Sequence, residues 1–277
     1  MPAERIAENL AFINWTVLAG LAVGSFAAVV LGRLRTDATR GYLGFTAACS
    51  GLLAWLAVLS DNALPASGTA PLLNALTWDD VRRAALVVLT VLAIAYVVAL
   101  ARGRRAPAIG VGGLASGGVA LAAGAMAWGV TGVGSLALFV QLSLLAGATG
   151  GVLAAMILGH WYLVTPKLGE MPLVLFSRLL TGIVAAQLLL FIVATGVGIG
   201  PSGSSGFGAL TGTWALFVWL RLVVGIVFPL VVSWAAIQTA RTRSMESATG
   251  LLYISVGTIA SGTILASGLY FGAGLLV

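Results

Sequence analysis

The side chains that could do chemistry in this 277-residue sequence are few and lie in apolar surroundings. His160 is the only histidine, and Trp161 and Tyr162 follow it directly in the stretch "GHWYL". Arg178 and Arg221 each interrupt a long apolar run. An imidazole can ligate haem or carry a proton, and a guanidinium binds carboxylate, phosphate or carbonyl oxygens through its planar fork of donors. These five residues are the candidate contacts for a cofactor such as a quinone.

Residue counts exclude several kinds of site. One histidine cannot supply both axial ligands of a haem, nor the ligands of a multi-histidine copper or zinc site. We therefore expect no metal and no cofactor held by this chain alone, and a haem only if a partner supplies the other ligand. No Asp or Glu lies well inside an apolar run, although ion-driven carriers usually bind their coupling ion with such carboxylates. Nothing in the sequence indicates hydrolytic catalysis.

The composition predicts an all-α protein of the membrane. Hydrophobic residues make up 60% of the chain and charged residues 8%, against about a quarter charged in soluble domains. Apolar runs of about 20 residues, long enough to cross a bilayer as a helix, recur along the chain. We expect eight transmembrane helices, at 11–32, 41–59, 84–101, 108–130, 135–163, 172–195, 212–238 and 247–275.

The placement of charge predicts the orientation of these helices. Basic residues concentrate in alternate short connections, which the positive-inside rule places on the cytoplasmic side, with both termini outside. These residues are Arg33, Arg35, Arg40, Arg102, Arg104, Arg105, Lys167, Arg241 and Arg243. Because they are scattered singly at helix ends, the net charge of +6 does not indicate a nucleic-acid partner.

The two longest connections, 60–83 and 196–211, fall on the outer side. In the first, Thr77 and Asp80 have the spacing of a helix-starting capping box, which predicts a short surface helix. The second is rich in Gly and Ser, which predicts a mobile loop or a segment ordered by another chain. We expect partner subunits to dock on these loops and lipid to surround the remainder.

An internal repeat divides the chain. The stretch "LAGLAVGSFAAVVLGR" (18–33) matches "LAGATGGVLAAMILGH" (145–160) at eight of sixteen positions. Three shorter matches follow in the same order: 45–54 with 176–185, 101–104 with 240–243, and 111–117 with 256–262. They predict two parallel four-helix repeats, 1–132 and 133–277, because an even number of spans leaves both copies in one orientation.

The repeat also allows candidate residues of the second half to be compared with the aligned residues of the first half. His160 aligns with Arg33, so it is either an interfacial anchor beside Trp161 or a contact for a cofactor or quinone. Arg178 is either a cation whose side chain reaches the headgroups or a functional contact in the membrane. Arg221 aligns with Arg82 but is expected to lie deeper, and Pro229 is expected to kink the same helix.

In architecture, two four-helix bundles with short inner loops and no soluble domain resemble the polysulfide-reductase or NrfD-type membrane subunits of bacterial respiratory oxidoreductases. The resemblance implies an eight-helix core that binds quinol without haem of its own, in the bacterial inner membrane. It rests on architecture, and no residue role is carried over from it.

Three functions follow as expectations. The first is a subunit that anchors a respiratory or electron-transfer complex and contributes to a quinone site. The second is a transporter or channel for a small anion or apolar solute, with its passage between the two halves. The third is a structural or assembly subunit without a cofactor.

Overall fold

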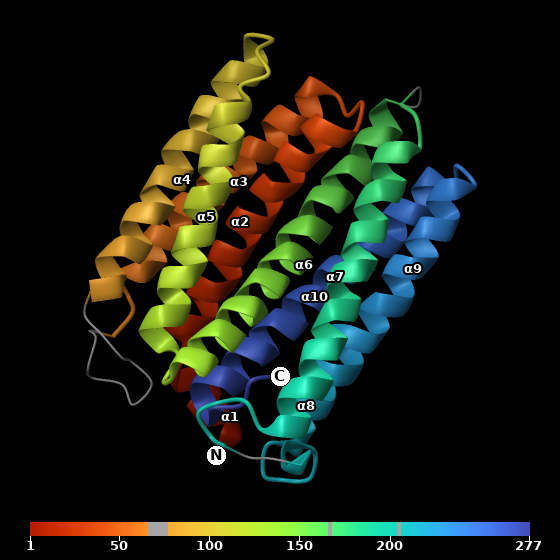
Figure 1. Cartoon of the computed structure of the whole chain (residues 1–277). Coiled ribbons are helices and arrows are strands. Elements are labelled where there is room, and N and C mark those ends of the chain that lie inside the picture. Colours follow the sequence, from red (N-terminus) through yellow and green to blue (C-terminus); the bar gives the residue numbers. More distant parts are fainter. Residues whose placement is uncertain (66–76, 166–167, 204–205) are drawn as a thin grey trace.

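A computed structural model describes residues 1–65, 77–165, 168–203 and 206–277 of the chain. All regular structure in these residues is helical (Figure 1). The helices are α1 (Pro2–Glu8), α2 (Leu10–Arg35), α3 (Arg40–Asp61), α4 (Thr77–Ala101), α5 (Pro107–Trp128), α6 (Gly132–Val164), α7 (Met171–Val197), η1 (Gly208–Leu210), α8 (Ala215–Leu222), η2 (Val223–Val227), α9 (Phe228–Arg241) and α10 (Met245–Ala273).

Eight helical segments in the described residues are long and apolar enough to cross a membrane, which confirms the predicted number. Seven are single helices, and the remaining one is the continuous segment from Ala215 to Arg241, built from α8, η2 and α9. The chain is therefore a multi-pass membrane protein.

One predicted element differs from the structure. Helix α4 begins at Thr77 and runs without a break to Ala101, so the short surface helix expected after Thr77 is the first part of a spanning helix. The sequence places Arg82 outside the apolar run, whereas in the structure it is buried against Asp61. Because the two charges neutralise each other, the helix can bury a turn that hydropathy alone assigns to the surface.

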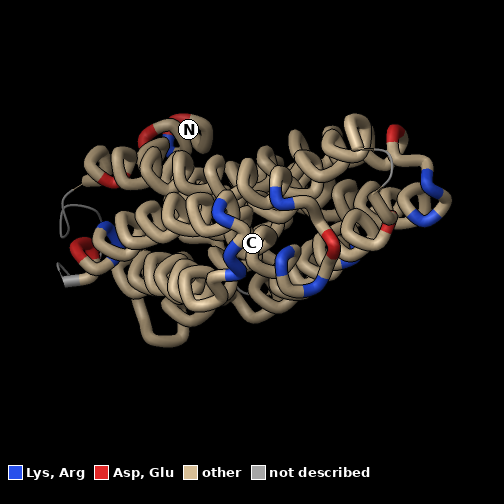
Figure 2. Tube along the Cα trace, turned by 90° about the horizontal axis from the view of Figure 1, so that it is seen from above, with Lys and Arg blue, Asp and Glu red and all other residues tan. Residues whose placement is uncertain are grey.

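The helices run between two ends of the molecule, and Figure 1 shows that both chain termini lie at the same one. We call this the terminal end. The opposite end, which we call the basic end, holds the connections α2–α3, α4–α5, α6–α7 and α9–α10. Figure 2 shows that charged residues lie mainly at helix ends and in connections, while most of the helical tube carries none.

Helices α2 and α6 pack against each other at the centre of the molecule (Figure 1). Their backbones meet at Gly24 and Gly150: a Cβ on Gly24 would overlap the carbonyl of Ala146, and one on Gly150 would overlap Ser25 N. We call this contact the glycine seam. It joins α2–α5 to α6–α10, the two groups that correspond to the predicted repeats, and the repeat itself stays a sequence prediction.

Hydrogen bonds add to the glycine seam on either side. The Tyr42 hydroxyl of α3 donates to the Ala154 carbonyl of α6 at 3.0 Å, and the Tyr270 hydroxyl of α10 donates to the Trp128 carbonyl of α5 at 3.0 Å. Both bonds are buried and cross between the two groups of helices, so the groups form one packed unit.

The span from Ala215 to Arg241 is continuous but changes its helical geometry just before Pro229, where a kink is predicted. The segment Val223–Val227 (η2) has π-helical geometry, and Pro229 stands in the first turn of α9. Proline has no N–H to donate to the carbonyl four residues earlier, which belongs to Gly225. The helix therefore changes its pitch one turn before the proline.

The connection after α7 packs on the chain itself where the structure describes it. Ser202 N donates to the Gly274 carbonyl at 3.0 Å, and Phe207 N donates to the Thr195 carbonyl at 3.1 Å. These bonds attach the two sides of the connection to the C-terminal ends of α10 and α7. Contacts within the chain therefore hold the described residues of this connection.

Candidate functional site

Arg221, on α8, is the most deeply placed of the predicted site residues. Its side chain is only 2% exposed. Its Nη2 donates to Gln187 Oε1 on α7 at 2.9 Å, and its Nη1 donates to the Gly225 carbonyl at 3.1 Å. From Gln187 to the end of α7 at Val197 the helix rises about 15 Å, at 1.5 Å per residue. The guanidinium thus lies well within the membrane-spanning part of the molecule.

Two glycines make room for this guanidinium. A Cβ on Gly225 would lie 2.6 Å from the Cα of Gly262, and a Cβ on Gly262 would lie 2.8 Å from Nη1 of Arg221. Any larger residue at either position would collide with the facing helix or with the arginine. The close approach of η2 to α10 and the position of Arg221 are therefore parts of one arrangement.

The charge of Arg221 has no carboxylate in contact with it among the described residues. Its Nε, also buried, has no hydrogen-bond partner there. A neutral amide and a carbonyl satisfy two donors but do not cancel a positive charge, and such a charge in a membrane costs at least a few kcal/mol. Nε therefore lacks the acceptor, such as a carbonyl or anionic oxygen, that would satisfy it.

Arg82 on α4, which the sequence alignment pairs with Arg221, is equally buried but is compensated. Its Nε donates to Asp61 Oδ2 at 2.7 Å, and its Nη1 donates to Asp79 Oδ1 at 2.7 Å. The guanidinium carbon also lies 4.8 Å from the centre of the Trp128 ring and 5.6 Å from that of Trp15. This cluster is a closed ion-pair and cation–π unit with a structural role.

Sequence reasoning missed the roles of Asp61 and Gln187. Both stand on the helix that precedes their arginine in the chain, Asp61 on α3 before Arg82 and Gln187 on α7 before Arg221. Asp61 looks like a surface acid because it ends an apolar run, and its side chain is nevertheless fully buried. A search for polar residues on the neighbouring helix of the same repeat, at matching depth, would have found both.

Arg178 does not join Arg221. It is exposed on the outer surface of α7, where the helix rises about 10 Å from Met171 at the basic end. Gln187, which does contact Arg221, lies further along α7 toward the terminal end. The position of Arg178 fits a cation whose flexible stem covers apolar surface while its head reaches the headgroups.

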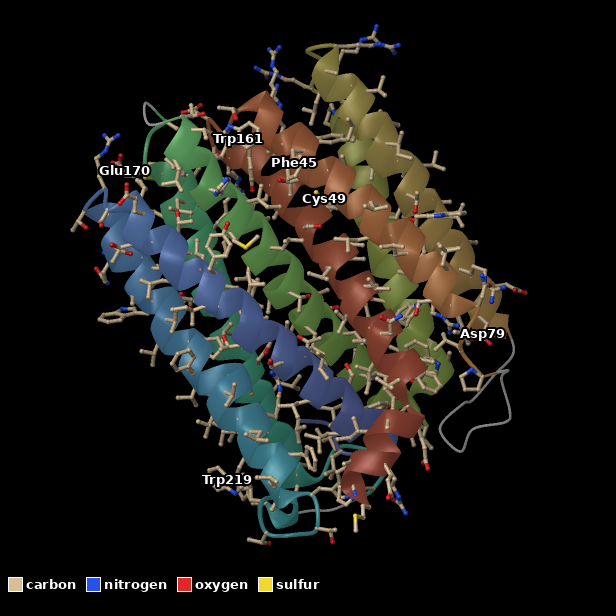
Figure 3. The ribbon with its side chains drawn as sticks, turned by 180° about the vertical axis from the view of Figure 1, so that it is seen from behind. Phe45, Cys49, Asp79, Trp161, Glu170 and Trp219 are labelled. Atoms are coloured by element: carbon tan, nitrogen blue, oxygen red, sulfur yellow. The ribbon has the colours of Figure 1, made fainter. Side chains whose placement is uncertain are left out.

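His160, Trp161 and Tyr162 end α6 at the basic end, far from Arg221 along the helices. Their environments differ: the His160 side chain is exposed, and Tyr162 is buried, with its hydroxyl donating to the Gly169 carbonyl. Trp161 packs over Gly41 and meets the Tyr42 ring edge-on, with centroids 6.4 Å apart. Figure 3 shows Trp161 at the basic end, as an interfacial aromatic residue would be.

Figure 3 also labels residues of the opposite end. Asp79 and Trp219 lie at the terminal end, whereas Glu170 lies with Trp161 at the basic end. The five predicted site residues therefore occupy three places: Arg221 inside the second group of helices, Arg178 on its outer face, and His160, Trp161 and Tyr162 at the basic end. The part of the chain that the structure describes contains no cluster of three or more His, Cys, Asp or Glu residues that could hold a metal ion.

The comparisons with known proteins add no relative: no protein-family model, curated protein or solved structure matches this chain.

Proposed function

We propose that this chain is an integral subunit that anchors an electron-transfer complex in a bacterial cytoplasmic membrane and contributes to a quinone site. The observation that carries the site is Arg221, a buried cation whose partners are an amide and a backbone carbonyl. A quinone supplies the chemistry that this arrangement needs, because its carbonyl oxygens accept hydrogen bonds and gain negative charge on reduction. The chain itself carries out no redox step and holds Arg221 as a donor.

The testable feature of the proposed quinone site is the Nε of Arg221. Nη1 and Nη2 each have one partner, so Nε is the guanidinium nitrogen without a partner among the described residues. Gln187 accepts from Nη2, which lies on the same edge of the guanidinium plane as Nε, and so fixes the orientation of that edge. Arg221 is thus the binding residue and Gln187 the positioning residue.

The glycine seam favours this anchor function over transport. A passage between the two halves would run along α2 and α6, but there the backbones of Gly24 and Gly150 are in contact. Buried bonds from Tyr42 to Ala154 and from Tyr270 to Trp128 hold the halves together on both sides. A carrier that works by rocking its halves would have to break this packing in each cycle.

Partner subunits are proposed to dock at the terminal end, on the connections 60–83 and 196–211. Residues 66–76 and 204–205 of these connections lie outside the described residues. Exposed apolar side chains cover much of the helical surface, including Leu52, Val91 and Leu189, as contact with lipid requires.

The first experiment is purification of the tagged chain from its native membrane in a mild detergent. Copurifying chains are identified by mass spectrometry, and an absorption spectrum and a quinone extraction are made on the same sample. Redox subunits with bound quinone support the proposal. A haem spectrum would direct attention to His160, with the second ligand on a partner. A colourless chain without partners contradicts the anchor function and directs the work to solute uptake in liposomes.

The quinone site has its own test in the purified complex. Gln187→Glu places a carboxylate 2.9 Å from Nη2 of Arg221 and compensates its charge, as Asp61 compensates Arg82. We expect quinone affinity to fall about tenfold or more, with the complex still assembled. Arg178→Gln removes one arginine from the same repeat and serves as the control. Equal quinone affinity in the wild type and in Gln187→Glu would exclude Arg221 as the quinone contact. If deletion of this chain lowered the amount of the complex but left its intrinsic rate unchanged, the chain would be an assembly subunit.

A further inference from the structure

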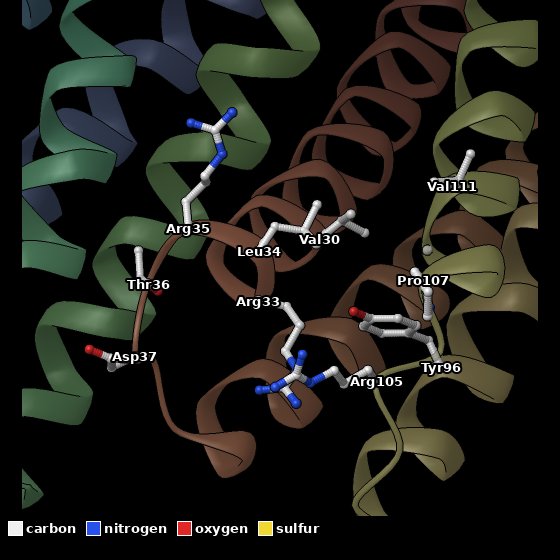
Figure 4. A pocket seen from close by; sticks show the side chains of 11 residues that line it. Val30, Arg33, Leu34, Arg35, Thr36, Asp37, Tyr96, Arg105, Pro107 and Val111 are labelled. Carbon is white, nitrogen blue, oxygen red and sulfur yellow. The ribbon is translucent and has the colours of Figure 1, made fainter.

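A cavity of about 640 Å³ opens at the basic end between α2, α4 and the start of α5 (Figure 4). Its polar lining includes Arg33 from the last turn of α2, Arg105 from the α4–α5 connection and Tyr96 from α4. None of these residues belongs to the quinone site proposed above. The volume lies within the range of about 300–1,000 Å³ typical of small-molecule pockets.

The two arginines reach the cavity from different segments. Figure 4 shows the guanidinium groups of Arg33 and Arg105 directed toward the same region, with the Tyr96 ring beside them. Arg105 precedes Ala106, whose φ of 42° turns the chain so that Pro107 can begin α5. The fold thus brings together two cations that lie far apart in the sequence.

The charges of these arginines are uncompensated in the described residues. No salt bridge there involves Arg33 or Arg105, and the Nε of Arg33 is buried without a hydrogen-bond partner. Asp37 also lines the cavity, but Figure 4 shows it apart from the two guanidinium groups. Two cations that face one space repel each other, so an anion between them would be stabilised by both.

Apart from Arg35, Thr36 and Asp37, the remaining lining is apolar and open. Val30, Leu34, Pro107 and Val111 line the cavity with the arginines, and Leu34 and Val111 are 65% and 61% exposed. The cavity therefore offers cationic donors at the level of the helix ends and an apolar wall along the outer surface. An amphiphile with an anionic head and a hydrocarbon chain has the complementary shape.

We infer that this cavity binds the phosphate headgroup of an anionic phospholipid, with Arg33 and Arg105 on the phosphate, the Tyr96 hydroxyl as a further donor, and the acyl chain along Val111. Guanidinium groups bind phosphate oxygens through paired, charge-assisted hydrogen bonds. Free phosphate has the same charge chemistry but would not use the apolar wall. The lipid is the source that accounts for both parts of the lining.

The other half of the molecule offers an internal contrast. His160 and Ser244 stand at the positions that align with Arg33 and Arg105. The cavity on that side, of about 600 Å³, is lined by Tyr162, Arg243 and Glu246 among others, and Arg243 pairs with Glu170 at 3.7 Å. Its cation already has carboxylates nearby, so the anion site is expected in the first half.

The test compares two double variants of the full-length chain in detergent, after removal of native lipid. Arg33→Gln with Arg105→Gln removes the proposed site, while Arg102→Gln with Arg104→Gln removes the same charge from exposed neighbours outside the cavity lining. Binding of phosphatidylglycerol and phosphatidylcholine is measured by native mass spectrometry. We expect the wild type to bind phosphatidylglycerol more tightly than phosphatidylcholine. The ratio of the two affinities should fall about tenfold or more in the first variant and stay within about twofold of the wild-type ratio in the control.

Two further measurements keep the inference falsifiable if the first double variant folds poorly. Val111→Trp keeps both arginines and fills the apolar wall, so it is expected to weaken phosphatidylglycerol binding while inorganic phosphate binding is unchanged. Equal lipid preference in the wild type and both double variants would overturn the inference. It would also be overturned if Val111→Trp bound phosphatidylglycerol as the wild type does, or if inorganic phosphate bound as tightly as the lipid.

Discussion

Arg221 donates a hydrogen bond from Nη1 to the carbonyl oxygen of Gly225, one turn further along the same span, at 3.1 Å. Pro229 has no N–H to give to that carbonyl, so the guanidinium supplies a donor where the regular helix lacks one. The arginine, the π-helical segment and the proline therefore depend on one another. This hydrogen bond uses Nη1, and Nε remains without a partner for the proposed quinone contact.

Gly262→Ala should destabilise the protein through this arrangement. The new Cβ would lie 2.8 Å from Nη1 of Arg221 and 2.6 Å from the Cα of Gly225, so backbone would have to move. We expect a loss of about 1–3 kcal/mol, the usual cost of overpacking a tight core. Gly257→Ala is the control on the same helix, because a Cβ there meets nothing within 4 Å. Thermal unfolding in detergent measures both, and equal midpoints would show that the close approach is not required.

Gly150→Ala should weaken the glycine seam. Its Cβ would overlap the backbone of Gly24 and Ser25, and α2 and α6 would have to separate. We expect a loss of about 1–3 kcal/mol, because small residues let membrane helices pack backbone to backbone. At the adjacent Gly151 a Cβ meets nothing within 4 Å, so Gly151→Ala should be neutral or slightly stabilising. A lowered midpoint in both variants would indicate a general intolerance of α6 rather than the seam.

Asp61→Asn should be the most destabilising of these changes. It leaves Arg82 buried with its main counter-charge removed, and removing one partner of a buried pair costs about 3–5 kcal/mol. Asp80→Asn, at an exposed position in the same region, should change the midpoint little. The double variant Asp61→Asn with Arg82→Gln should recover part of the loss, because the buried cation is removed together with its buried counter-charge. Absence of any recovery would argue against the ion pair as the cause.

Gln187→Leu should destabilise the second group of helices. It removes the acceptor of Arg221 Nη2 and leaves that donor buried without a partner, at a cost of about 1–3 kcal/mol. Gln238→Leu, at an exposed glutamine of α9, is the matched control. If the two leucine variants unfolded at the same temperature, the bond between α7 and α8 would contribute nothing measurable.

Residue types and their order were sufficient for the membrane architecture. Apolar runs of bilayer length predicted eight spans, and the missing N–H of Pro229 predicted an irregularity in the seventh, where the structure has a π-helical segment. The sequence also identified Arg221 as a deep cation.

Only the tertiary structure decided which polar groups meet. It paired Arg82 with Asp61 and Arg221 with Gln187, turned Arg178 outward, and gathered Arg33 with Arg105 around one cavity. The physical reason is that the rotation and depth of each helix are set by close packing between helices, as at Gly24 and Gly150, and hydropathy carries almost no information about rotation when nearly every face of a helix is apolar.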